Sequence, residues 1–251
     1  MRIAFDLDGV LADLHGSYVQ TALRLFPELD PAVVRSPEVG ASPPDVETGS
    51  LAEPEPTVPG VPSLIDLPLT SRQSAVVWRS LAEVENFWET LAEIEPGMID
   101  RLAKLADERR WEMLFITSRP HSAGRTVQRQ SQRWLQSLGF PMPSLYVVHG
   151  SRGLIAKALH IDVVVDDRPE NCLDVALESQ AGAILVWRGS RAGVPASARR
   201  MGIAVVPSVE SCLEAIVQIE QPEDRGGVLD RLRRLFGLRT SRPSGTSSSP
   251  E

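Results

Sequence analysis

The chain has 251 residues, of which 42% are hydrophobic and 24% charged, and 26 Lys and Arg against 33 Asp and Glu give a net charge of −7. These values are ordinary for a globular protein, and the length allows one large domain or a core domain with a smaller insertion. Because phosphate backbones attract a basic face, the acidic balance argues against a stable complex with nucleic acid. Cys172 and Cys212 are too few for a disulfide framework, and we expect reduced thiols.

The sequence carries no pattern typical of membrane insertion or export. It contains no run of 18 or more apolar residues, so we expect no transmembrane segment. The chain opens on a short apolar run that is followed by Asp6 and Asp8, which leaves no room for a charged and then hydrophobic leader. We therefore expect a cytoplasmic protein.

The first residues predict a strand, a turn and a helix. Residues 3–5 are apolar and end at Asp6-Leu7-Asp8-Gly9, which is typical of a strand that closes in a tight turn. Apolar side chains then recur at helical spacing over residues 14–27, where Pro27 ends the pattern. This indicates one amphipathic helix.

A proline-rich insertion follows, and helical patterning then resumes. Residues 36–63 contain seven prolines without periodicity, so we expect a disordered or extended segment there. Residues 71–91 predict a second helix, which Pro96-Gly97 closes off. One stripe of this helix consists of Trp78, Leu81, Val84 and Trp88.

From Gly97 onward, helical segments alternate with short apolar runs. The helical segments are residues 98–109, 123–138, 153–159, 170–180 and 209–219, and the apolar runs are 113–116, 145–148, 163–165, 183–187 and 203–206. This alternation, with strands that are apolar throughout, predicts a doubly wound parallel sheet covered on both faces.

The long gap between the first and second predicted strands defines the domain organisation. We expect an α/β core formed by residues 1–13 and 97–221, with residues 14–96 inserted after the first strand as a small helical cap. Residues 222–251 are expected to form a short amphipathic segment at 228–236 and a disordered tail. That segment is expected to pack back onto the sheet, the alternative being an anionic membrane or a partner.

Polar side chains follow the predicted strands at the edge where a doubly wound sheet binds ligands. They are Asp6 and Asp8, Thr117-Ser118-Arg119, Lys157, and Asp166-Asp167. Converging carboxylates cannot all stay ionised in a dry crevice without a cation, and Mg²⁺ suits oxygen ligands beside a substrate phosphate. A hydroxyl, backbone N–H groups and an ammonium group would hold anionic oxygens, so the set predicts phosphoryl transfer.

These residues match the motifs of a known family. The segments Phe5-Asp6-Leu7-Asp8-Gly9-Val10-Leu11-Ala12-Asp13, Ile116-Thr117-Ser118-Arg119-Pro120, Lys157 and Val165-Asp166-Asp167-Arg168-Pro169-Glu170-Asn171 resemble the four motifs of the haloacid-dehalogenase superfamily of phosphatases, in order. Their detailed form is most similar to the 5′-(deoxy)nucleotidase branch. Sugar-phosphate and polynucleotide 3′-phosphatases share parts of it. The resemblance covers residues 1–13 and about 97–206.

The resemblance implies a role for each matching residue. Asp6 would be the nucleophile that accepts the phosphoryl group, and Asp8 the general acid and then base. Mg²⁺ would be held by Asp6, by the Asp8 backbone carbonyl and by one or both of Asp166 and Asp167. The substrate phosphate would be bound by Thr117, Ser118 and Lys157.

Several neighbouring residues have a structural as well as a functional interpretation. Asp13 is expected to cap the following helix. Arg119 and Arg168 would either reach a substrate phosphate or pair with nearby carboxylates. Phe87 and Trp88 are expected to pack the cap rather than to stack on a nucleobase.

The resulting hypothesis is a Mg²⁺-dependent phosphomonoesterase that acts through an aspartyl-phosphate on a small phosphorylated substrate, with nucleoside 5′-monophosphates first. One alternative is a sugar-phosphate or polynucleotide-end phosphatase. Another is a non-catalytic interaction protein built on the same fold. The substrate and the oligomeric state are left open by the sequence.

Overall fold

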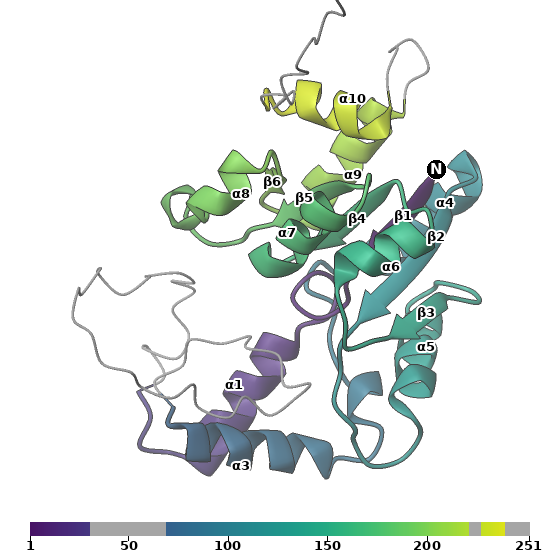
Figure 1. The fold of residues 1–251 in the computed structure, drawn as a ribbon. Coiled ribbons are helices and arrows are strands. Elements are labelled where there is room, and N and C mark those ends of the chain that lie inside the picture. The colour runs from purple at the N-terminus through teal and green to yellow at the C-terminus, as the bar shows by residue number, and fades with distance from the viewer. Residues whose placement is uncertain (31–68, 221–226, 239–251) are drawn as a thin grey trace, which may run out of the picture.

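The computed structural model describes residues 1–30, 69–220 and 227–238. The proline-rich segment predicted at 36–63 and the end of the predicted tail lie outside these residues. The described chain forms an α/β fold around a six-stranded parallel sheet (Figure 1). Its strands are β1 (Arg2–Phe5), β2 (Glu112–Thr117), β3 (Ser144–Val147), β4 (Val163–Asp166), β5 (Gly182–Val186) and β6 (Ala204–Val206).

The strand order β3-β2-β1-β4-β5-β6 confirms the predicted doubly wound sheet. Ala4 of the central strand β1 is in register with Leu114 of β2 on one side and with Val164 of β4 on the other. The chain extends the sheet first beyond β2 and later, in the opposite direction, beyond β4. Because ligands bind where the strand order reverses, the crevice of interest lies at the carboxyl ends of β1 and β4.

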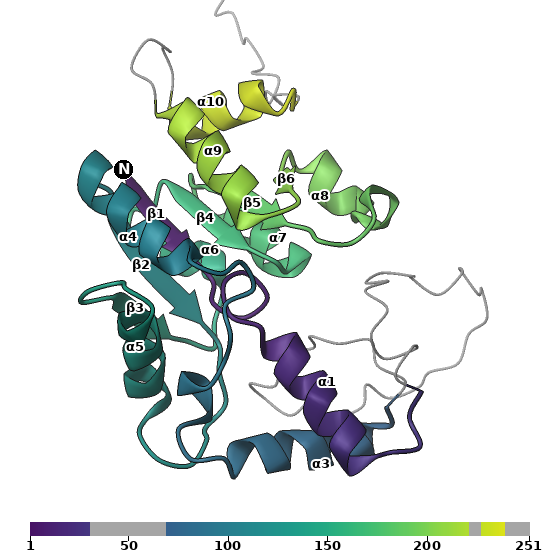
Figure 2. The same ribbon diagram turned by 180° about the vertical axis from the view of Figure 1, so that it is seen from behind.

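Helices cover both faces of the sheet. One face carries α4 (Met98–Arg109), α5 (Val127–Ser137) and α9 (Val209–Ile219), and the other carries α6 (Arg152–Ala158), α7 (Pro169–Glu178) and α8 (Ala196–Arg200). Side chains alternate between the faces: Ile3 and Phe5 join the core on one face and Ala4 the core on the other. Figure 1 views the sheet from the side of α6 and α7, and Figure 2 from the side of α4 and α9.

Among the described residues between β1 and α4, two helices form a small layer apart from the sheet (Figure 1). These are α1 (Leu14–Leu25), which begins at the predicted cap residue Asp13, and α3 (Ser71–Ala82). They pack together through the Tyr18 and Trp78 rings, whose centroids are 5.2 Å apart. The Tyr18 hydroxyl also shares a 2.7 Å hydrogen bond with Ser74 Oγ. The cap expected after the first strand is therefore present as a helical pair.

The single helix predicted over residues 71–91 is wrong in its second half. Helix α3 ends at Ala82, and Asn86 adopts a left-handed backbone with φ 53°. The Asn86 N–H donates to the Ala123 carbonyl at 2.9 Å, and its Oδ1 accepts from the Arg125 N–H at 2.9 Å. These tertiary hydrogen bonds replace the next helical turn, so Trp88 lies in a separate 3₁₀ turn, η1 (Phe87–Glu89).

The other boundaries agree with the predictions to within a few residues. The largest shift is in α5, which begins four residues late because the Thr126 side chain caps it by accepting from the Arg129 N–H. Two short elements, α8 and the 3₁₀ turn η2 (Arg191–Gly193), were not predicted. Both have fewer than six residues, too few for a periodic pattern to stand out.

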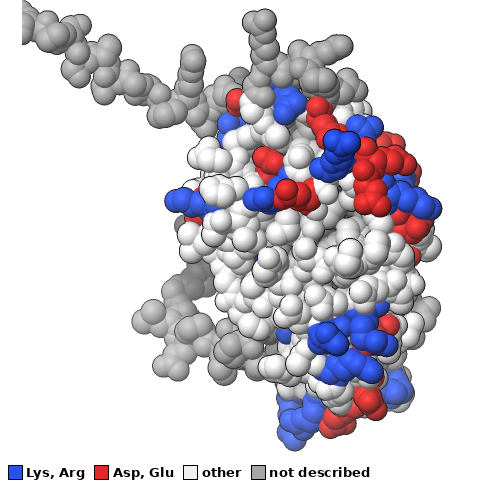
Figure 3. All heavy atoms as spheres, turned by 90° about the vertical axis from the view of Figure 1, so that its right-hand side faces the viewer, with Lys and Arg blue, Asp and Glu red and all other residues white. Residues whose placement is uncertain are grey.

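The C-terminal amphipathic segment packs back onto the core, as expected. Helix α10 (Val228–Leu235) lies against α9 and β5, and its Leu232 side chain is fully buried. None of the helices in the described parts of the chain is long and apolar enough to cross a membrane. On the face drawn in Figure 3, acidic and basic side chains lie mixed together on either side of a broad uncharged band.

Truncation of Leu232 tests the docking of α10. Leu232→Ala is expected to lower the free energy of unfolding by at least about 2 kcal/mol, because it leaves a cavity between α10, α9 and β5. Leu235, on the same helix, is 42% exposed, so Leu235→Ala should change stability by less than about 0.5 kcal/mol. Urea unfolding of the two variants measures the difference, and equal losses would show that α10 is not docked through Leu232.

Candidate active site

Four carboxylates converge at the carboxyl ends of β1 and β4. Asp6 directly follows β1, and its N–H donates to the Val165 carbonyl at 2.9 Å. Asp166 is the last residue of β4. The exposed fractions are 7% for Asp6, 4% for Asp8 and 0% for Asp166. One oxygen each from Asp6, Asp166 and Asp167 lie within 4.8 Å of one another, so these three side chains share one small volume.

A glycine lets the loop after β1 approach this cluster. Gly9 has φ +80°, a conformation that side chains with a β-carbon rarely adopt. A β-carbon at this position would also collide with Asp167 Oδ2. Gly9 is therefore required both by the turn and by the contact with the carboxylate.

Asp8 is held by a bidentate ion pair with Arg119. Arg119 Nε donates to Asp8 Oδ2 at 2.8 Å and Nη2 donates to Oδ1 at 2.6 Å. The third nitrogen, Nη1, donates to Ser131 Oγ at 2.8 Å. The guanidinium carbon also lies 4.6 Å from the ring centroid of Trp88 and 5.8 Å from that of Trp134. Because every nitrogen of the Arg119 guanidinium is hydrogen-bonded and the group stacks on two rings, Arg119 holds the Asp8 carboxylate in one orientation.

The Asp8 carboxylate keeps room for one more hydrogen bond. A carboxylate has about four lone-pair positions. Arg119 uses one on each oxygen, and Thr117 Oγ1 donates to Oδ2 at 3.3 Å. One position on Oδ1 is thus left for a substrate or for water.

Arg152 lies among the other carboxylates. It is 5% exposed and begins α6. Its Nη2 is 3.3 Å from Asp6 Oδ1, and its Nε is 3.7 Å from Asp166 Oδ2. Buried atoms without a hydrogen-bond partner include Arg152 Nε and Asp167 Oδ1. An anionic ligand group would satisfy the Arg152 donor, and a cation would satisfy the Asp167 acceptor.

The charges at the site do not balance. The four carboxylates face the two buried guanidinium groups of Arg119 and Arg152, so full ionisation leaves two uncompensated negative charges. Burial raises the pKa of Asp6 well above its usual range, and Asp166 raises it further. Burial and the Asp166 charge act in the same way on the pKa of Asp167. Burial also raises the pKa of Asp166, against the lowering effect of Arg152.

A divalent cation fits this donor set. The three clustered side chains of Asp6, Asp166 and Asp167 offer only oxygen, the ligand type that Mg²⁺ prefers. Asp166 is already held by Asn171 Nδ2, at 3.1 and 2.9 Å, and by the Arg168 N–H at 2.9 Å. Asp167 Oδ1 has no hydrogen-bond partner among the described residues, so Asp167 is the freer of the two adjacent carboxylates to bind a cation. The Asp8 side chain faces Arg119, so any contact of Asp8 with a metal would come from its backbone carbonyl.

The predicted phosphate-binding residues differ in where they lie. Thr117 is fully buried, and its hydroxyl is directed to Asp8. Ser118 is partly exposed, and its Oγ lies 2.9 Å from His149 Nδ1. Lys157 is exposed in the last turn of α6 and forms no ion pair with any carboxylate that the structure describes. It lies five residues beyond Arg152, about 7.5 Å farther along the helix axis and on another face.

Two site residues were missed by the sequence reasoning. Arg152 and His149 both follow β3, at the edge of the sheet where the other polar residues were sought. The position of Arg152 directly after the helix cap Ser151 was the available signal. Arg119, for which a substrate phosphate and a carboxylate had both been considered, pairs with Asp8. Arg168 lies 4.0 Å from Glu170.

Arg188, which follows β5, holds the loop after Asp8 by hydrogen bonds to its backbone. Arg188 donates to the carbonyls of Gly9, at 2.5 Å, and Val10, at 3.1 Å, and to Glu95 Oε1 at 2.7 Å. Glu95 also accepts from the Val209 N–H at 2.8 Å at the start of α9. Burial raises the pKa of Glu95, but these hydrogen bonds lower it more, so that the net shift is downward. The turn that carries Asp8 is thus tied to β5, α4 and α9.

The raised pKa values predict how stability depends on pH and on Mg²⁺. The folded protein retains protons that the unfolded chain has released, so the unfolding free energy of the metal-free protein should fall as pH rises above about 4. Mg²⁺ should restore stability at neutral pH, by about 2.7 kcal/mol at a hundred times its Kd. The gain should be smaller near pH 5, where protons compete for the same oxygens. Thermal unfolding with and without Mg²⁺ measures both effects.

Asp167→Asn is the sharpest variant for this test. Removing one repelling charge should stabilise the metal-free protein at neutral pH and abolish most of the Mg²⁺ gain. Asp107→Asn, on the exposed face of α4, is the matched control and should leave both quantities unchanged. An undiminished Mg²⁺ gain in Asp167→Asn would exclude this cluster as the cation site.

Comparisons with known proteins find similar folds. No family model and no curated protein matches the sequence. A hydrolase from Pseudomonas syringae has 15% identity and a TM-score of 0.43, with 96% of this chain and 100% of that chain covered. A HAD family hydrolase from Deinococcus radiodurans R1, with bound phosphate and sodium, has 18% identity and a TM-score of 0.49, covering 86% and 94%. A haloacid dehalogenase-like hydrolase from Streptococcus pneumoniae has 14% identity and a TM-score of 0.46, covering 85% and 96%.

Proposed function

We propose that this protein is a Mg²⁺-dependent phosphomonoesterase of the haloacid-dehalogenase type, with Asp6 as the nucleophile. The observation that carries the proposal is the convergence of Asp6, Asp166 and Asp167 in one small volume beside the Arg152 guanidinium, whose Nε has no hydrogen-bond partner among the described residues. Such a site offers a nucleophile, a place for a cation and a guanidinium donor for phosphoryl oxygens. Asp8, fixed by Arg119 two residues after Asp6, adds a group for proton transfer.

In the first step, an Asp6 carboxylate oxygen attacks phosphorus and forms an acyl-phosphate bond while the bond from phosphorus to the leaving oxygen breaks. Asp8 begins this step protonated at the free position on its Oδ1 and gives that proton to the leaving oxygen. The leaving alcohol then departs neutral. Two carboxylates two residues apart on one rigid turn place the nucleophile and the acid on the same phosphoryl group.

In the second step, Asp8 takes a proton from a water molecule, whose oxygen attacks phosphorus and displaces the Asp6 carboxylate. Inorganic phosphate leaves, and Asp6 is regenerated. Arg152 lies beside Asp6 and donates to the phosphoryl oxygens in both steps, which stabilises the charge that accumulates there. Ser118, whose Oγ hydrogen-bonds to His149 Nδ1, is a further donor to the phosphoryl oxygens.

Mg²⁺, when bound by Asp6, Asp166 and Asp167 and by the Asp8 carbonyl, would neutralise negative charge on the phosphate. Without this charge, the repulsion among the buried carboxylates disfavours an ionised nucleophile. The protein residues therefore position the reacting groups, and the cation makes their ionised forms compatible.

As the substrate we propose a nucleoside 5′-monophosphate. A cavity of about 200 Å³ lies between α3 and the loop that follows Arg119. It is lined by Trp78, Leu81, Ala82, Trp88 and Pro120 and by the polar residues Arg79, His121 and Ser122. The aromatic surface in this lining supports the proposal, since it would suit a planar base.

The deciding experiment is phosphate release from a panel of nucleoside monophosphates, sugar phosphates and 3′-phosphorylated oligonucleotides, with and without Mg²⁺. We expect Mg²⁺-dependent turnover with nucleoside 5′-monophosphates preferred, and a loss of at least about a thousandfold in Asp6→Asn. A preference for sugar phosphates or oligonucleotide ends would replace the substrate assignment. A folded protein that binds Mg²⁺ but hydrolyses none of the panel would favour the non-catalytic alternative.

Substitutions of Arg152 and Lys157 are expected to have different effects on kcat. Arg152→Gln is expected to reduce kcat about a hundredfold or more, the usual effect of removing one charge-stabilising donor. Lys157→Gln, on the same helix, should change kcat by less than about twofold. Arg152→Lys keeps the charge and controls for loss of folding, and circular dichroism checks all three variants. A large effect of Lys157→Gln would return the phosphate-binding role to Lys157.

A further inference from the structure

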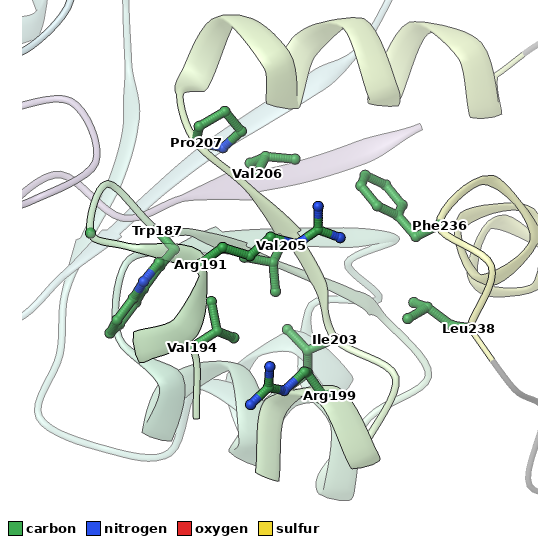
Figure 4. Close-up of a pocket in the computed structure, with 11 residues that line it drawn as sticks. Trp187, Arg191, Val194, Arg199, Ile203, Val205, Val206, Pro207, Phe236 and Leu238 are labelled. Carbon is green, nitrogen blue, oxygen red and sulfur yellow. The ribbon is translucent and has the colours of Figure 1, made fainter. Parts of the chain in front are cut away.

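A second cavity lies at the β6 edge of the sheet, away from the carboxylates. Its volume is about 720 Å³, within the range of sites that bind small molecules. It is bounded by the segment after β5, by η2 and α8, by β6, and by the end of α10 (Figure 4). None of the residues described above as part of the carboxylate site lines it.

Apolar side chains form most of its wall. Trp187 lies on one side, and Phe236 and Leu238 on the other, with Val205 of β6 between them (Figure 4). Trp187 Nε1 already donates to the Ser190 carbonyl at 2.9 Å, so the indole N–H is satisfied within the protein. The ring therefore contributes an apolar surface and no unmet donor.

Two arginines provide the charge. Arg191 and Arg199 both line the cavity, and none of the acidic residues that the structure describes does. Within the described parts of the chain, neither guanidinium forms an ion pair, although acidic residues outnumber basic ones in the sequence. Figure 4 shows that the Arg191 side chain extends across the space from the Trp187 side toward Phe236.

A mostly apolar cavity whose described lining carries two guanidinium groups and no carboxylate is complementary to a ligand with an apolar body and an anionic group. We propose that this cavity is a second binding site, which takes a small aromatic anion. The aromatic body lies between Trp187 and Phe236, and the anionic group pairs with Arg191 and Arg199. This site is independent of the proposed phosphatase activity.

The probe for this site is 8-anilinonaphthalene-1-sulfonate, an aromatic anion that becomes fluorescent in apolar surroundings. We expect saturable binding of one probe per chain that weakens as salt is added. The double variant Arg191→Gln/Arg199→Gln should weaken binding about five- to tenfold, because it removes two partly exposed charge contacts. Both arginines are exposed, so the variant is expected to remain folded, which its melting temperature checks.

Two controls separate this site from general apolar binding. Arg200 lies beside Arg199 on α8 but does not line the cavity, so Arg200→Gln should change probe affinity by less than about twofold. The neutral probe N-phenyl-1-naphthylamine should bind the double variant as it binds the unaltered protein. Unchanged sulfonate binding in the double variant, or an equal loss in Arg200→Gln, would overturn the proposal.

Discussion

Four carboxylates meet at one edge of the sheet, and the repulsion among them is the constraint to which the surrounding structure responds. Asp6 and Asp166 are brought together because β1 and β4 are neighbours at the point where the strand order reverses. Burial removes the water that would otherwise screen their charges. The neighbouring arginines and a glycine without a β-carbon are the features that make this arrangement possible.

The two buried arginines, Arg119 and Arg152, pair with different carboxylates and differ in how many of their nitrogens are hydrogen-bonded. Arg119 uses every nitrogen within the protein, on Asp8 and Ser131, and stacks on Trp88 and Trp134. It is therefore a positioning group that is not free to bind substrate. Arg152 Nε lies 3.7 Å from Asp166 Oδ2 but has no hydrogen-bond partner among the described residues. A donor held in place but unsatisfied is suited to a ligand, since the cost of its burial is recovered only when the ligand binds.

The same contacts connect the inserted helices to the site. Trp88 belongs to the η1 turn that follows α3, and its indole donates to the Pro120 carbonyl at 3.1 Å while its ring covers Arg119. The position of the helical pair is thus tied to the group that orients Asp8. On the opposite side, Arg188 ties the Gly9 turn to β5, and its neighbours Trp187 and Gly189 line the second cavity. The turn that carries Asp8 is held from both sides by residues distant in sequence.

The sequence by itself determined the sheet, most of its helices and the carboxylates. Burial of one side of each helix and strand gives the apolar residues a regular spacing, so the alternation from residue 98 onward predicted the parallel sheet. Asp6, Asp8, Asp166 and Asp167 directly follow predicted strands, so they were predicted to lie at one edge of that sheet. Only the tertiary structure decided which basic side chain pairs with them: Arg152 reaches Asp6 across 146 residues of sequence, whereas Lys157 is exposed and forms no ion pair with a described carboxylate. It also decided where α3 ends, since the hydrogen bonds that stop the helix come from residues 123 and 125. Local patterns record which side of an element is buried, whereas a side chain's partner depends on which elements the fold places opposite it.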